Sequence, residues 1–242
     1  MTLPGEEERR RKEGWNWGYG VGRDSVHMCL HLYKMKILNL YANIGGNRKL
    51  WGDEHQITSV EIDPKIAEIY KDFWPNDTIV VADAHQYLLE HYQEFDFIWS
   101  SPPCPTHSKA RYAIAKGTDF EKYPHLQKPV YPEMSLYQEI LFLKHFFKGK
   151  YCVENVIAWY EPLITPTEMG GHYFWTNFYL RNMQTGNRAH TETIENLQKR
   201  KGFDLSKYSG IDKRLMLRDI TEPELGKHIL DCATNELQPS FL

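Results

Sequence analysis

Cysteine is scarce in this sequence and is never paired. Its four cysteines, Cys29, Cys104, Cys152 and Cys232, lie far apart, and no Cys-x-x-Cys element occurs. That pattern excludes a disulfide-bonded scaffold and a zinc ribbon. We therefore expect free thiols in a reducing compartment and no bound metal.

Long apolar runs and an excess of charge of one sign are also absent. No stretch approaches the roughly 18 uncharged apolar residues of a membrane-spanning helix, and the first residues lack the apolar centre of a signal peptide. The 242 residues carry 29 Lys and Arg against 32 Asp and Glu, a net charge of -3, which argues against a protein that coats DNA by charge alone. We expect an intracellular protein without a membrane partner.

The order of strand-like and helix-like segments predicts an α/β fold. Residues 1–34 contain a charge cluster and a Trp- and Gly-rich run, and they are expected to form a flexible N-terminal arm. Helices are expected from Pro64 and over 133–147. β-rich runs at 36–42, 57–61, 78–82, 95–100 and 150–154 alternate with helix-length segments. This alternation predicts a doubly wound, mostly parallel sheet, in which ligands bind beyond the carboxyl ends of the strands.

The first three strand ends carry residues suited to an adenosine-containing cofactor. A turn with paired glycines after a strand lets backbone approach a ligand, and acidic side chains can accept hydrogen bonds from ribose hydroxyls and from an adenine amino group. The absence of a Walker lysine pattern disfavours ATP hydrolysis. The candidate residues are Tyr41, Asn43, Ile44, Gly45 and Gly46 of the turn, Glu61 and Ile62 after the second strand, and Asp83 after the third.

The fourth and fifth strand ends carry residues suited to covalent catalysis. Pro102 and Pro103 stiffen the loop that presents Cys104, an arrangement that favours a positioned nucleophile over a merely packed thiol. Glu154 and Asn155 follow the fifth strand on the same rim of the predicted sheet. Cys104 and Glu154 are therefore predicted to lie close together.

In this order, the five elements resemble those of the cytosine-5 DNA methyltransferase family, particularly its short members from phages and mobile elements. The resemblance runs from about Lys36 to Ala233 and includes two later segments, 172–177 and 222–228. It implies a Rossmann-like methyltransferase fold that uses S-adenosylmethionine, with Pro102 among the residues that contact the cofactor. It implies that Cys104, on the Pro103-Cys104 loop, attacks carbon 6 of a flipped cytosine while Glu154 holds ring nitrogen 3, and that Asn155 orients the loop.

Two departures from the family pattern concern the cofactor turn and the base site. Asn43 replaces the first glycine of the turn, which Asn can accommodate because it tolerates a left-handed backbone. The Gln-x-Arg-x-Arg element that helps hold the base is not clearly present, and Arg181 or Arg188 are the candidates to replace it.

A basic segment supports a nucleic-acid surface. Residues 181–218 contain nine basic and four acidic residues, a local charge of 9 - 4 = +5, where the family places its target-recognition region. The expected organisation is an arm at 1–34, a catalytic domain at 35–180, a short recognition region at 181–218 and a C-terminal segment at 219–242 that returns to the catalytic domain. The candidate DNA contacts are Ser108, Lys109, Arg111, Arg181, Arg188, Lys199, Arg200 and Lys201.

The residues leave several functions open beside methylation of carbon 5 in DNA. Ser101-Pro102-Pro103 meets half of the pattern of enzymes that methylate an exocyclic amine on cytosine or adenine. The same chemistry on RNA and a non-catalytic DNA-binding relative also remain open. The resemblance further implies DNA as partner, a role in restriction and modification with any restriction nuclease on a separate chain, and a place in the cytoplasm, at the nucleoid or in a phage-infected host.

Overall fold

A computed structural model describes residues 34–109, 131–184 and 192–234, all within the unit Tyr33–Leu242. The predicted arm at 1–34 therefore lies almost entirely outside the described residues, as do Arg111 and Arg188. No helix in the described ranges is both long enough and apolar enough to cross a membrane.

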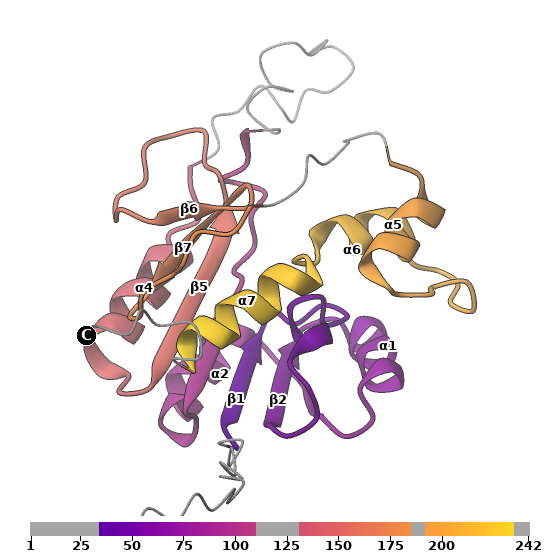
Figure 1. Cartoon of the computed structure of the whole chain (residues 1–242), viewed down its shortest axis with the longest axis horizontal. Helices are drawn as coiled ribbons and strands as arrows, with labels where there is room; N and C mark the ends of the chain where they lie inside the picture. Colours follow the sequence, from indigo (N-terminus) through magenta and orange to yellow (C-terminus); the bar gives the residue numbers. More distant parts are fainter. Residues whose placement is uncertain (1–33, 110–130, 185–191, 235–242) are drawn as a thin grey trace, which may run out of the picture. The chain divides into compact units, whose positions relative to one another are not determined.

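A seven-stranded sheet with the order β3-β2-β1-β4-β5-β7-β6 forms the centre of this unit (Figure 1). The first five strands pair in parallel, and β7 and β6 are antiparallel. All five predicted strands are present, and the doubly wound, mostly parallel α/β class is confirmed. The strands are β1 (Lys36–Leu40), β2 (Gln56–Glu61), β3 (Thr78–Val81), β4 (Phe97–Ser100), β5 (Lys150–Val156), β6 (Thr167–Met169) and β7 (His172–Thr176).

Both predicted helices are also present. Pro64 occupies the first turn of α1, where its missing N–H costs nothing, and the Asp63 carboxylate accepts a hydrogen bond from the Lys65 N–H at 2.8 Å. The helix predicted over 133–147 is α4. The helices are η1 (Asn47–Leu50), α1 (Pro64–Phe73), α2 (Ala84–His91), η2 (Tyr92–Glu94), α4 (Ser135–Phe146), α5 (Ile194–Lys201), α6 (Lys213–Asp219) and α7 (Pro223–Ala233).

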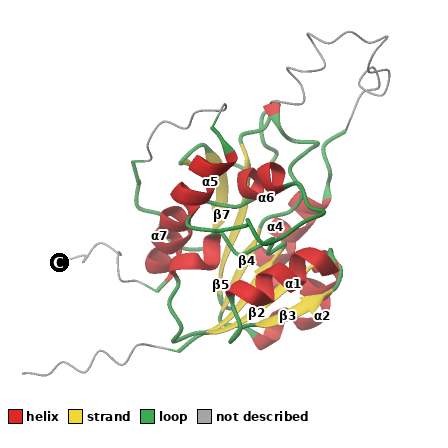
Figure 2. Cartoon of the chain, turned by 90° about the vertical axis from the view of Figure 1, so that its right-hand side faces the viewer, coloured by secondary structure: helices red, strands yellow, loops and turns green. Residues whose placement is uncertain are grey.

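Apolar side chains cover both faces of the sheet, as the parallel strands require. On one face, Leu225 and Ile229 of α7 pack against Phe97 and Trp99 of β4. On the other face, α2 and α4 pack against alternate residues of the same strands, such as Ile98. A third cluster joins α1 to α5 and α6, which lie beside each other (Figure 2).

Helix α7 packs against η1, which follows the first strand of the sheet. Gly226 of α7 lies so close to η1 that an added Cβ would stand 2.3 Å from the Asn47 carbonyl oxygen. The Trp51 indole donates to the Gly226 carbonyl at 3.1 Å. This packing holds the turn after β1, which lies where the sheet order reverses and where open α/β sheets bind their ligands.

Candidate active site

The turn after β1 has a left-handed backbone at three positions. Tyr41, Asn43 and Gly45 have φ angles of 57°, 47° and 81°. The Asn43 side-chain oxygen accepts a hydrogen bond from the Ile44 N–H at 2.8 Å, which supports this conformation locally. Asn43 thus takes the left-handed backbone that the sequence led us to expect.

Packing against neighbouring parts of the protein explains several residue choices in this turn. The Ile44 side chain is fully buried against residues of α1, α5 and α6, so only its backbone can face a ligand. An added Cβ on Gly45 would lie 2.6 Å from Trp74 Nε1, and one on Gly46 would lie 2.5 Å from the Thr221 carbonyl oxygen. The paired glycines therefore satisfy packing within the protein.

Glu61 links the ends of β1 and β2. One carboxylate oxygen accepts from the Asn43 N–H at 2.9 Å, and the other accepts from the Asp63 N–H at 3.0 Å. Each oxygen keeps a second lone pair, which can accept from a ribose hydroxyl. The next residue, Ile62, is 67 % exposed and offers an apolar surface to a base. Asp83 is exposed at the start of α2, where it accepts from the Gln86 N–H. This donor and acceptor set fits an adenosine-containing cofactor.

A buried carboxylate beneath these strand ends was not predicted. Glu139 of α4 is fully buried and accepts from the Tyr41 hydroxyl at 2.6 Å and from the Ser100 hydroxyl at 2.5 Å. It also contacts His85 Nδ1 at 3.0 Å. The hydrogen bond with Glu139 raises the pKa of His85, although its burial opposes the shift. The sequence signal that could have identified Glu139 is an acidic residue among the apolar residues that repeat at helical spacing over 133–147.

The loop after β4 holds Cys104 in a turn. The His107 and Ser108 N–H groups both donate to the Cys104 carbonyl, at 2.9 and 3.1 Å. The Asn155 amide donates to the Pro102 carbonyl at 2.9 Å, so β5 is tied directly to this loop. Pro103 is exposed beside the cysteine. Cys104 follows β4, and Glu154 lies in the adjacent parallel strand β5, one residue beyond the register partner of Ser100.

The residues after β5 hold the other side of the loop. Ser108 and Ala158 form an isolated β-bridge, and the Trp159 N–H donates to the His107 carbonyl at 3.0 Å. The Trp159 indole donates to the Thr106 carbonyl, also at 3.0 Å. Sequence reasoning did not identify Trp159, because an aromatic residue in a loop carries no signal of its partner.

The surroundings of Cys104 keep its thiol protonated. Burial, followed by the negative charges of Asp219 and Glu154, raises the pKa of Cys104 from 9.0 to about 11. Asp219 ends α6 and remains exposed, so water partly screens its charge. Only about one Cys104 in 10⁴ is therefore a thiolate at pH 7 in the free protein.

Glu154 stays ionised although it is buried. Burial alone would raise its pKa, but the charge and hydrogen bond of His172, the Ser101 hydroxyl and the Lys201 charge together hold the pKa below its ordinary value. His172 Nδ1 lies 2.5 Å from Glu154 Oε1. His172 stands at the start of β7, the antiparallel neighbour of β5. Among the described residues, a histidine of β7 therefore contacts Glu154 directly.

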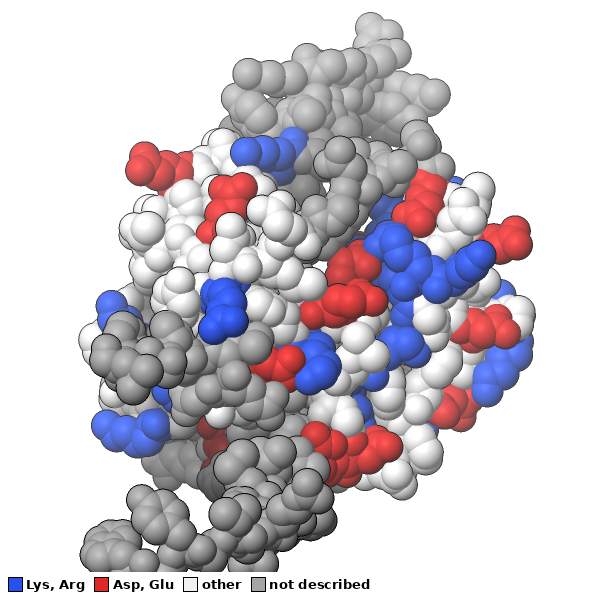
Figure 3. Space-filling model, viewed as in Figure 1, with Lys and Arg blue, Asp and Glu red and all other residues white. Residues whose placement is uncertain are grey.

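The basic residues of α5 have different environments. Lys199 is exposed, whereas Lys201 is buried with its ammonium 3.2 Å from Glu222, and Arg200 forms ion pairs with Glu192 and Glu222. Lys201 is therefore removed from the predicted DNA contacts, because its charge is already neutralised inside the protein. Figure 3 shows Lys and Arg gathered with acidic side chains over the region of α5 and α6. Ser108 is half-buried, and Lys109 and Arg181 are exposed.

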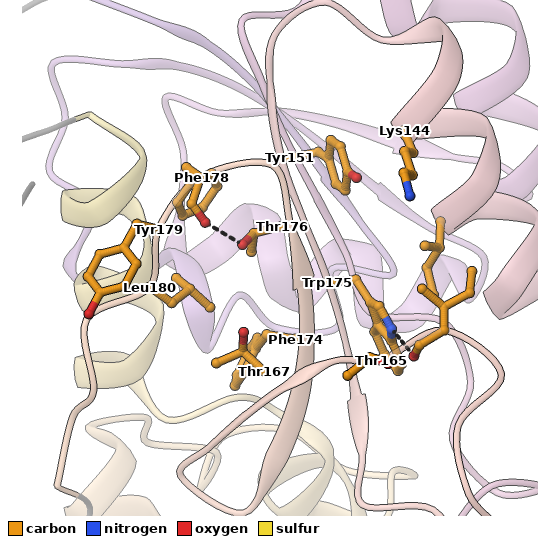
Figure 4. Close-up of a pocket in the computed structure, with 12 residues that line it drawn as sticks. Lys144, Tyr151, Thr165, Thr167, Phe174, Trp175, Thr176, Phe178, Tyr179 and Leu180 are labelled. Atoms are coloured by element: carbon orange, nitrogen blue, oxygen red, sulfur yellow. Dashed lines mark hydrogen bonds between the residues drawn. The ribbon is translucent and has the colours of Figure 1, made fainter.

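A cavity of about 390 Å³ lies elsewhere, beside β5, β7 and β6 of the sheet (Figure 4). The Trp175 indole donates to the Ile164 carbonyl at its rim. Lys144, Tyr151 and Leu180 also line it, and none of the predicted site residues does. No function is assigned to this cavity. Within the described ranges, no group of three or more His, Cys, Asp or Glu residues could hold a metal ion.

Residues 35–122 match the family described as C-5 cytosine-specific DNA methylase. The matched segment includes β1 to β4 and Cys104, while Glu154 and His172 lie beyond it. This match supports that family. The sheet has the order of S-adenosylmethionine-dependent methyltransferases, so the predicted Rossmann-like methyltransferase fold is present. Comparison with curated proteins finds no matching sequence.

Two solved structures illustrate the structural similarity. The methyltransferase EhMeth of Entamoeba histolytica is 8 % identical, with 85 % of this chain and 99 % of that chain covered, at a TM-score of 0.48. A mutant of DNMT2 from Spodoptera frugiperda is 24 % identical, with 50 % of this chain and 35 % of that chain covered, at a TM-score of 0.32. Because both TM-scores are low, the fold is assigned from the order and direction of the strands in the sheet.

The raised Cys104 pKa predicts how the thiol reacts. Alkylation of Cys104 by iodoacetamide should accelerate about tenfold per pH unit until about pH 11, because the thiolate is the reactive form. Asp219→Asn should move the end of this rise to lower pH, since it removes a nearby negative charge. Asp231→Asn, at a carboxylate that pairs with Lys227, is the control. Peptide mass spectrometry measures the rate at Cys104, and a plateau at or below pH 9 in the wild type would contradict this prediction.

Proposed function

We propose that this protein transfers a methyl group from S-adenosylmethionine to carbon 5 of cytosine in DNA, through a covalent adduct with Cys104. The observation that carries the proposal is that Cys104 follows β4 while Glu154 lies in the adjacent parallel strand β5, just beyond the end of β4, and the Asn155 amide donates to the Pro102 carbonyl. The Glu154 charge acts on the Cys104 thiol, and a thiol and a carboxylate that share one site can act on two positions of one ring. The family match over residues 35–122 supports the same chemistry.

The cofactor would lie across the ends of β1, β2 and β3. Glu61 would accept from the ribose hydroxyls, Ile62 would cover a face of the adenine, and Asp83 would accept from the adenine amino group. The backbone of the 41–46 turn would contact the remaining part of the cofactor, next to Pro102. When bound, S-adenosylmethionine supplies an electrophilic methyl group.

Cys104 would act as the nucleophile. Carbon 5 of cytosine is a weak nucleophile, and addition of the thiolate to carbon 6 turns the ring into an enamine that can accept a methyl group. Forming the thiolate at pH 7 from a thiol with a pKa near 11 costs on the order of 5 kcal/mol. Cys104 therefore stays protonated, and is a poor nucleophile, until a bound substrate changes its surroundings.

Glu154 would recognise the base. Its carboxyl group can bond to ring nitrogen 3 and to the exocyclic amine, which distinguishes cytosine from thymine. Asn155 would hold the loop rather than touch the base, because its amide already binds the Pro102 carbonyl. The cytosine has to leave the duplex stack to reach these groups.

DNA would contact the exposed basic residues near the site. Lys109 follows the Cys104 turn, and Lys199 lies on α5, which packs with α6 beside the cofactor turn. The shortness of the 181–218 segment supports an enzyme of the phage or mobile-element type with a small recognition sequence. A restriction nuclease, if it accompanies this protein, would be a separate chain.

Removing the Cys104 thiol should abolish methylation. Mass spectrometry of nucleosides from DNA incubated with S-adenosylmethionine should detect 5-methylcytosine with the wild type and none with Cys104→Ala, because the variant cannot form the adduct. Binding of DNA and cofactor should persist in the variant. Cys232→Ala, which removes a thiol buried in α7, is the matched control and should retain activity.

Other products would identify the competing functions. Methyl groups on an exocyclic amine would favour amine methylation through the Ser-Pro-Pro element. Modification of RNA alone would change the substrate, and cofactor binding without any modified base would indicate a non-catalytic relative. Formation of 5-methylcytosine by Cys104→Ala would show that the covalent mechanism is wrong.

Neutralising exposed lysines should weaken DNA binding. Lys109→Gln together with Lys199→Gln should reduce the slope of log Kd against log salt by up to about 2, since each phosphate contact releases about 0.9 counterions. Lys36→Gln is the control, because Lys36 is exposed at the start of β1, on the opposite rim of the sheet. Fluorescence anisotropy at several salt concentrations measures the slope. An unchanged slope would place the DNA surface elsewhere.

A further inference from the structure

One buried carboxylate joins the two loops that the proposed reaction needs. Glu139 Oε1 accepts a hydrogen bond from the Tyr41 hydroxyl at 2.6 Å, and Oε2 accepts one from the Ser100 hydroxyl at 2.5 Å. Tyr41 is the first residue after β1, and Ser100 is the last residue of β4. These two hydrogen bonds connect α4 to the cofactor turn and to the start of the loop that carries Cys104.

The register of the sheet makes this connection possible. Leu40, the last residue of β1, pairs in parallel with Ser100, the last residue of β4, so these two strands end at the same level. The order of the sheet reverses between β1 and β4. Glu139 therefore contacts both strand ends at the point where open α/β sheets bind their ligands.

The backbone of Tyr41 adopts a conformation that needs support from its surroundings. A φ of 57° is uncommon for an aromatic residue, because its Cβ crowds the following carbonyl oxygen. Such a conformation persists only where neighbouring groups determine it. Burial, followed by the charge of Glu139, raises the pKa of the Tyr41 hydroxyl above its ordinary value, so the hydroxyl stays protonated and continues to donate.

Packing alone does not account for a carboxylate at this position of α4. Glu139 lies on the buried face of the helix with Leu136, Ile140 and Leu143, and its side chain has no exposed area. An apolar residue of similar size at such a position is often as stabilising as a buried charge with its partners. His85 Nδ1 of α2 also contacts Oε1, at 3.0 Å, so side chains from three separate segments converge on this one group.

We propose that Glu139 is a positioning residue that holds the cofactor turn and the Cys104 loop at a fixed separation, through Tyr41 on one side and Ser100 on the other. This inference rests on the proposed function. Glu139 acts through its neighbours and not on the base or the cofactor. It keeps the methyl donor and the thiol in the geometry that transfer between two bound groups requires.

On the loop side, Ser100 is the first of three consecutive anchored residues. The Trp99 indole donates to the Ser101 hydroxyl at 2.7 Å, and the Asn155 amide donates to the Pro102 carbonyl at 2.9 Å. These two anchors come from β4 and β5, whereas the bond of Ser100 comes from a helix. Loss of the Ser100 hydroxyl should therefore loosen the start of the loop without removing any bond of the cofactor turn.

Two variants that each remove one hydroxyl test the two sides separately. Tyr41→Phe should raise the Kd of S-adenosylmethionine about tenfold and leave kcat within about threefold, because a hydrogen bond to a charged group is lost on the cofactor side. Ser100→Ala should lower kcat about tenfold and leave this Kd within about threefold. Glu139→Gln should produce both changes. Tyr208→Phe is the matched control and should produce neither, since its hydroxyl donates to the exposed Asp72 carboxylate at 2.9 Å.

The separation of the two effects distinguishes positioning from a general loss of structure. Calorimetry measures the Kd of the cofactor, and nucleoside mass spectrometry at saturating cofactor measures kcat for 5-methylcytosine formation. An unchanged Kd in Tyr41→Phe or an unchanged kcat in Ser100→Ala would overturn the inference and leave the proposed function intact. Kd and kcat that change together in both variants, with a lower melting temperature, would also overturn it.

Alkylation of Cys104 tests the loop side without DNA. Burial is the main cause of the raised pKa of Cys104, so a looser loop should lower this pKa and make the thiol more accessible. Ser100→Ala and Glu139→Gln should speed the reaction with iodoacetamide at pH 8 by at least about threefold, whereas Tyr41→Phe and Tyr208→Phe should not.

These readouts separate the inference from the proposed function. Alkylation rates in Ser100→Ala and Glu139→Gln that equal the wild-type rate would overturn the inference independently of any activity. Absence of 5-methylcytosine from the wild type, together with the expected changes in Kd and alkylation, would overturn the proposed function and support the link that Glu139 makes between the two loops.

Discussion

The parallel pairing of β4 with β5 brings the two chemical groups of the site together. Ser100, the last residue of β4, is in register with Val153, so Glu154 is the first residue of β5 beyond the end of β4. A slip by one residue would turn Glu154 toward the opposite face of the sheet. The Asn155 bond to the Pro102 carbonyl and the Ser108–Ala158 bridge hold the two strand ends together beyond the sheet. Every chemical role proposed for Cys104 depends on this geometry.

Two buried carboxylates organise the strand ends from different directions. Glu139 gathers hydrogen bonds from the residues after β1 and from the end of β4, and Glu154 is balanced by His172 and Lys201. Burying an unpaired carboxylate costs several kcal/mol, so each has to be satisfied by partners of matching charge or donor capacity. Cys104 has the opposite environment, since its carboxylate neighbours oppose ionisation. The site thus combines an ionised carboxylate with a protonated thiol in the free protein.

Much of the fold and of the candidate site could be predicted because the signals are local. Short β-rich runs, the proline that opens α1 and the residues just after each strand are visible within a few positions. The contacts of His172, Glu139 and Trp159 could not be predicted, because each depends on a partner at least 18 residues away. The error concerning Lys201 has the same origin, since sequence shows its charge but not Glu222 beside it. The hairpin of β6 and β7 was missed as a pair of strands, and with it the partner of Glu154.

The central claim is that Cys104 forms a covalent bond with carbon 6 of cytosine, and trapping that adduct tests it most directly. DNA that contains 5-fluorocytosine should stop the reaction after methyl transfer, because a base cannot remove fluorine as it removes hydrogen. Mass spectrometry of the digested complex with S-adenosylmethionine should then find the modified base on the peptide that contains Cys104. A methylated product without an adduct, or an adduct on a different residue, would contradict the account.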